Sequence, residues 1–89
     1  MKVVLDFKNI LDKIMMHQYL KEKLEFPDYY GNNLDALYDM LTSLEEGTFI
    51  EIINYQNFEK NDEKYFKSLC ELFEDVNNED LGVKIILKK

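Results

Sequence analysis

Three short β-rich runs divide the chain, and helical patterns fill the stretches between them. The β-rich runs are residues 3–7, 48–53 and 83–87. The middle run is almost continuously apolar, which is typical of a buried central strand. Because strands separated by helices pair in parallel through right-handed crossovers, this order predicts an α/β fold with a three-stranded parallel sheet. Three to four helices are expected to pack on this sheet.

The expected helices follow from apolar side chains that recur at helical spacing. The three clearest stretches are residues 12–25, 34–46 and 63–77. The second should end near Gly47, because glycine suits a helix C-cap. Residues 55–61 are ambiguous, although Phe58 could hold a short helical turn there.

Length and charge restrict the class of protein. A chain of 89 residues, 46% of them hydrophobic, forms one small domain with a single core. Its 18 acidic and 11 basic residues give a net charge of −7, which argues against nucleic-acid binding and favours a cationic protein partner. No apolar run is long enough for a signal peptide or a membrane span, so we expect a cytoplasmic protein without membrane association. The free protein is expected to be a monomer.

The most informative motif covers residues 27–39. Pro27 pushes the preceding residue out of the helical region and so ends the first helix. Gly31 can take the positive φ of a sharp turn. Asn32 and Asn33 are both good N-caps, and Asn32 as cap would place Asp35 at the third helical position, in a loose capping box. The motif therefore predicts a tight loop that leads directly into a helix.

This helix has two contrasting faces. The leucines expected in the core are Leu34, Leu37 and Leu41. The opposite side carries Asp35, Asp39, Thr42 and Glu46. Asp35 and Asp39 repel each other at i and i+4, which costs roughly 0.2–0.5 kcal/mol. A solvated face can be acidic, but the chain has no Lys or Arg between Lys23 and Lys60, whereas a surface selected for stability usually mixes signs. The acidic stripe is therefore interpreted as a surface for a basic partner.

Catalytic and metal-binding patterns are weak. His17 has no nucleophile in a motif with it, and we expect a surface or capping histidine. Cys70, the single cysteine, lies on an apolar helix stripe and is expected to be a small buried hydrophobe. Asp35 and Asp39 could in principle act as the acid and base of a glycosidase or hold a divalent cation. A convex helix face and the lack of further oxygen ligands disfavour both roles. We expect no enzyme activity, no metal and no cofactor.

The residues of this motif resemble one family closely. Leu24, Pro27, Tyr29-Tyr30-Gly31, Asn33 to Leu37, Asp39 and Leu41-Thr42 match the pattern of the barstar family, the intracellular inhibitors of barnase-type ribonucleases. The resemblance extends upstream to His17-Gln18 and downstream to Ile85-Ile86-Leu87. It implies that residues 1–89 form a single barstar-like domain of a bacterial protein. It also implies a one-to-one complex that blocks the active site of a basic, secreted, barnase-like ribonuclease.

The resemblance also implies which residues bind this partner. The position of Asp39 is the leading acidic contact, where an RNA phosphate would lie, and Asp35 is the second. The complete implied set is Tyr29, Gly31, Asn33, Leu34, Asp35, Tyr38, Asp39, Thr42, Ser43, Leu44, Asp75 and Glu79. The best-known member of the family has tryptophan where this chain has Tyr38 and Leu44, and glycine where it has Ser43. An alternative role on the same scaffold is an immunity or regulatory protein for another basic protein or toxin.

Overall fold

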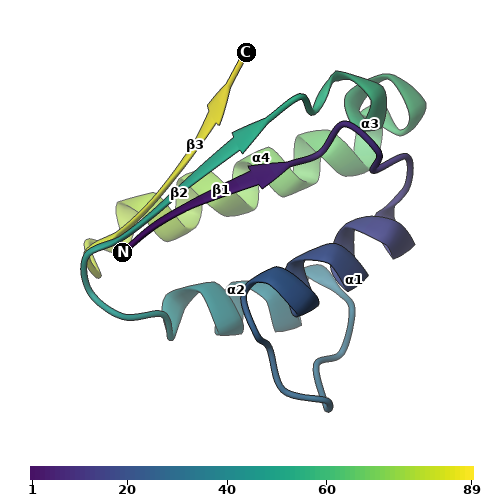
Figure 1. The fold of residues 1–89 in the computed structure, drawn as a ribbon. Coiled ribbons are helices and arrows are strands. Elements are labelled where there is room, and N and C mark those ends of the chain that lie inside the picture. Colours follow the sequence, from purple (N-terminus) through teal and green to yellow (C-terminus); the bar gives the residue numbers. More distant parts are fainter.

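The computed structural model describes residues 1–89, and its sheet has three parallel strands (Figure 1). The strands are β1 (Lys2–Asp6), β2 (Thr48–Ile53) and β3 (Val83–Lys88). Their order in the sheet is β1-β2-β3, with Val3 paired to Ile50 and Ile50 paired to Ile85. The predicted α/β class, the parallel pairing and the central position of the apolar run are therefore confirmed.

The helices are α1 (Lys13–Lys23), α2 (Leu34–Thr42), α3 (Gln56–Asn61) and α4 (Glu63–Asn78). Because the strands follow one another across the sheet, right-handed crossovers carry the helices to the same face. Burial alternates accordingly along β2, where Ile50 and Ile52 are buried while Phe49 and Glu51 are half-buried. The other face is open, and Val4 of β1 is half exposed there.

Helix α2 is held by its leucines. Leu37 and Leu41 are fully buried and α2 packs against α4, which supplies Leu69 and Val76 to the same core. Leu34, expected to be buried, is only half-buried because it lies at the first turn, beside the loop. The apolar arc predicted from helical spacing thus faces the core, and the acidic residues face outward.

The start of α2 differs in detail from the prediction. Asn33, rather than Asn32, is the N-cap, and its Oδ1 accepts a hydrogen bond from the Ala36 N–H at 2.8 Å. Asn32 takes the positive φ of the turn, 53°, which Gly31 does not. Asparagine tolerates this left-handed conformation, so the turn does not need the glycine. Asp35 is therefore at the second helical position, and the expected capping box does not form.

The end of α2 also differs, because the helix stops at Thr42 instead of continuing to Glu46. The hydroxyl of Thr42 donates to the Tyr38 carbonyl at 2.8 Å, and that of Ser43 donates to the Asp39 carbonyl at 2.8 Å. Hydroxyl groups that bond backbone carbonyls in this way compete with the helical ladder and favour its end. Glu46 therefore lies in the turn before β2, outside the helix.

The second half of the chain matches expectation closely. Residues 56–61 form the short helix α3, and Phe58 is completely buried within it. Helix α4 has the predicted amphipathic pattern and covers residues 63–78. None of the helices combines the length and the apolar character needed to cross a membrane.

Candidate functional site

Helix α2 presents its carboxylates to solvent, and neither makes an ion pair within the chain. Asp35 and Asp39 are both exposed, one turn apart. The ion pairs of the molecule lie elsewhere, on the open face of the sheet, where Lys2 and Lys88 approach Glu51 at 4.0 and 3.9 Å. The negative charge of α2 is therefore not neutralised within the chain.

Tyr38 connects this helix to the acidic end of α4. Its side chain is half-buried, and burial together with the nearby carboxylate of Glu79 raises the pKa of its phenol. Asp75 and Asp39 raise this pKa further. Carboxylates of α2, of α4 and of Glu79, which directly follows α4, thus lie near this phenol, and the acidic surface extends from α2 to Asp75 and Glu79.

The loop before α2 exposes one tyrosine and buries the next. Tyr29 is 82% exposed, whereas Tyr30 is only 4% exposed. The Tyr30 ring lies 4.8 Å from that of Phe26, centre to centre, and its N–H donates to the Pro27 carbonyl at 3.0 Å. The loop therefore projects an aromatic side chain beside the first turn of α2.

His17 is buried, so the expectation of a surface or capping histidine is wrong. Its Nδ1 lies 2.7 Å from the Tyr30 hydroxyl and its Nε2 lies 2.7 Å from the Tyr65 hydroxyl of α4. Burial, together with the charge of Lys13, lowers the pKa of the imidazole. The position of His17 in the helix could have indicated this burial, because His17 shares the helix face of Met16 and Leu20, both of which are buried.

The other predicted residues lie around the acidic surface, but several of their polar groups are already bonded. Asn33 donates to the Gly31 carbonyl at 3.3 Å in addition to capping α2. The hydroxyls of Thr42 and Ser43 are bonded to α2 carbonyls, and Leu44 packs partly against the core. The polar groups of Asn33, Thr42 and Ser43 are therefore bonded within the chain, whereas the carboxylates of Asp35 and Asp39 and the ring of Tyr29 are exposed.

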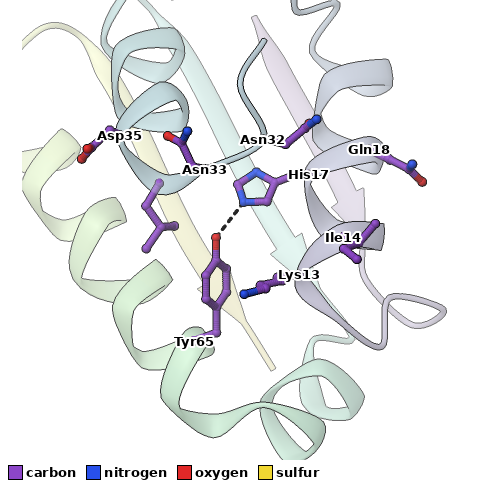
Figure 2. Close-up of a pocket in the computed structure, with 9 residues that line it drawn as sticks. Lys13, Ile14, His17, Gln18, Asn32, Asn33, Asp35 and Tyr65 are labelled. Carbon is purple, nitrogen blue, oxygen red and sulfur yellow. Dashed lines mark hydrogen bonds between the residues drawn. The ribbon is translucent and has the colours of Figure 1, made fainter.

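A cavity of about 480 Å³ opens beside this surface, between α1, the loop and the start of α2 (Figure 2). His17 and Tyr65 form part of its wall, with Lys13 and Asp35 on either side. Asp39 is not among the lining residues, so the two aspartates do not face each other across a cleft. The structure contains no group of three or more His, Cys, Asp or Glu side chains placed to hold a metal ion.

An acidic surface whose carboxylates make no ion pair within the chain is one to which a basic protein can be steered. Comparison with known protein families identifies the family. The chain belongs to the barstar family, because the family model described as barstar (barnase inhibitor) matches residues 1–88. The resemblance found in the sequence is thereby confirmed, and the family is one of inhibitors rather than enzymes.

A curated relative agrees with this family. Over 41 residues the chain is 51% identical to a Bacillus subtilis (strain 168) protein named "Putative ribonuclease inhibitor YrdF". The match covers 46% of this chain and 45% of the relative, so it spans less than half the length of either protein. The family and this relative both support a role in ribonuclease inhibition.

Proposed function

We propose that this protein inhibits a basic, barnase-like ribonuclease in a one-to-one complex formed in the cytoplasm. Helix α2 and the loop before it would enter the active-site cleft of the enzyme. The observation that carries the proposal is that Asp35 and Asp39 are exposed and have no cationic partner in their own chain. Water solvates this surface in the free protein, and a cationic partner would in addition offset the repulsion between the two carboxylates.

The chemistry of a ribonuclease cleft fits this surface. Such a cleft uses Arg, Lys and His side chains to bind RNA phosphates, and a carboxylate can replace a phosphate as their anion. Arginine can grip a carboxylate through two parallel hydrogen bonds, which adds geometric specificity to the charge attraction. Burying these charges is favourable only when every partner is hydrogen-bonded, so the two surfaces must match closely.

The residues divide into central and peripheral roles. Asp39 lies in the middle of α2, beside Tyr38, and is proposed as the group that replaces the RNA phosphate. Asp35 is the second acidic contact, and Tyr29 supplies an exposed ring from the loop. The outer contacts would come from Asp75 of α4, from Glu79 directly after it, and from residues 42–44 at the end of α2.

The direct test is titration of the purified chain into barnase during cleavage of an RNA substrate. The proposal expects activity to fall linearly and to disappear at one molar equivalent, with the same stoichiometry in titration calorimetry. A double variant, Asp35→Asn with Asp39→Asn, is the control for the acidic mechanism. A folded parent chain that leaves the enzyme fully active in excess would contradict a barnase-like target and favour the alternative immunity role.

A further inference from the structure

A largely buried hydrogen-bond network, Tyr30–His17–Tyr65, lies beside the cavity that Asp35 also lines, and it connects three segments of the fold. Tyr30 belongs to the loop, His17 to α1 and Tyr65 to α4, and both links measure 2.7 Å. Figure 2 shows the imidazole facing the Tyr65 hydroxyl at the edge of the cavity. None of the three residues belongs to the proposed contact set.

Within the Tyr30–His17–Tyr65 network, both ring nitrogens of His17 have a hydrogen-bond partner. A neutral imidazole has one donor and one acceptor nitrogen, so one tyrosine hydroxyl donates to His17 while the other accepts from it. No buried side-chain nitrogen or oxygen in the molecule lacks a hydrogen-bond partner. A fully bonded buried network of this kind fixes the positions of its members, because losing one bond leaves a buried polar group unpaired.

The loop has few other attachments to the body of the protein. Among residues 27–33, Tyr30 is the only one that is buried. Its bond to His17 is also the only side-chain hydrogen bond from this segment to an element other than α2, because Asn33 bonds within the segment and to the first turn of α2. The other contact given for its ring outside the network is with Phe26, at 4.8 Å between ring centres, and Phe26 directly precedes this segment.

We propose that His17 is a positioning residue for ribonuclease binding, which holds Tyr30 in place and thereby fixes the exposed Tyr29 and the first turn of α2. Tyr65 orients the imidazole from the opposite side. The loop is then ordered before the partner arrives, so binding does not pay the entropy of ordering it. This inference rests on the proposed function for the identity of the partner, but the ordering of the loop is a property of the free chain.

The first measurement therefore uses the free protein. Hydrogen exchange of the amide at residue 30, which donates to Pro27, reports whether the loop is closed. Tyr30→Phe and His17→Leu should speed this exchange by about tenfold, the effect of one lost hydrogen bond. His17→Gln, which keeps a donor and an acceptor, should restore most of the protection.

Tyr19→Phe is the matched control, because the Tyr19 hydroxyl also makes one partly buried hydrogen bond, with the Asp6 N–H at 2.9 Å, but away from the loop. It should leave exchange at residue 30 within about twofold of the parent. If Tyr30→Phe and His17→Leu retain parental exchange at residue 30, or if Tyr19→Phe accelerates it equally, His17 does not position the loop.

The second measurement is the affinity of the same variants for barnase. Tyr30→Phe and His17→Leu should weaken binding by about tenfold, while His17→Gln and Tyr19→Phe stay within about threefold. If Tyr30→Phe and His17→Leu speed exchange at residue 30 but bind barnase with parental affinity, His17 has no positioning role in binding. A parent chain that does not bind barnase would refute the proposed target instead, and the exchange experiment would still decide whether His17 orders the loop.

Discussion

Replacing Asp39 with asparagine removes one charge from the centre of the acidic surface and leaves the fold intact. The Asp39 side chain is exposed and makes no ion pair, and its backbone carbonyl still accepts the hydroxyls of Thr42 and Ser43. The substitution also removes the repulsion with Asp35, one turn away. The free energy of unfolding should therefore stay the same or rise by roughly 0.2–0.5 kcal/mol.

Binding should respond in the opposite direction. In the complex, Asp39 would be desolvated against the cationic groups of the ribonuclease, and its loss leaves those groups buried without a counter-charge. Truncating one partner of such a pair costs about 2–5 kcal/mol. Converted at about 1.4 kcal/mol per decade, this is a loss of roughly 30-fold to several-thousand-fold in affinity.

Titration calorimetry against barnase measures this loss, and thermal melts of the free variants run alongside. Glu46→Gln is the matched control, because it makes the same change in net charge at an exposed side chain in the turn before β2. Its cost should be about 0–1 kcal/mol, as for an exposed charge in a wet rim. Equal losses for the two variants, or an Asp39→Asn protein that binds like the parent, would refute the phosphate-mimic mechanism.

Three further predictions concern steering, the core and pH. The association rate with a basic ribonuclease should fall as ionic strength rises while the dissociation rate changes less, and a stopped-flow series with a constant association rate would contradict electrostatic steering. Leu37→Ala should lower the free energy of unfolding by roughly 2–5 kcal/mol in urea titrations, whereas Leu81→Ala, at a 41% exposed site, should change it by less than about 0.5 kcal/mol. Because burial and Lys13 lower the pKa of His17 below its usual 6.5, the unfolded chain binds this proton more readily, so stability should decrease as the pH falls below 6.5. His17→Gln should reduce this slope, and an identical pH profile for the two proteins would show that His17 does not cause it.

The order of elements and the orientation of α2 were predictable because they follow from repeated local signals. The apolar run at residues 48–53 predicts a buried strand, and the spacing of the apolar side chains of α4 predicts a helix. In both cases tertiary packing favours the same structure as the local pattern. For α2, the spacing of Leu37 and Leu41 fixes which side meets the core. The outward position of Asp35 and Asp39 follows from the same geometry.

The details that escaped prediction depend on short polar side chains and on contacts between distant segments. Thr42 and Ser43 end α2 by bonding its carbonyls, although the helical charge pattern continues to Glu46. The helix face that His17 shares with Met16 and Leu20 indicates its burial, but its hydrogen-bond partner Tyr65 is 48 positions away in the chain and comes near it only in the folded state. Local patterns cannot reveal a partner at that distance.

The long crossover that contains α2 has a consequence for folding. The register of β1 and β2 joins Lys2 to Phe49, so the acidic helix lies inside a loop that closes only when these distant segments meet. Helix α2 then packs on α4, which belongs to the next crossover, between Thr48 and its partner Val83. Pairings so far apart in the chain give a high contact order, which slows folding relative to helical bundles. The acidic surface that we propose for ribonuclease binding spans both crossovers, so we expect it to be complete only after these distant strand pairings have formed.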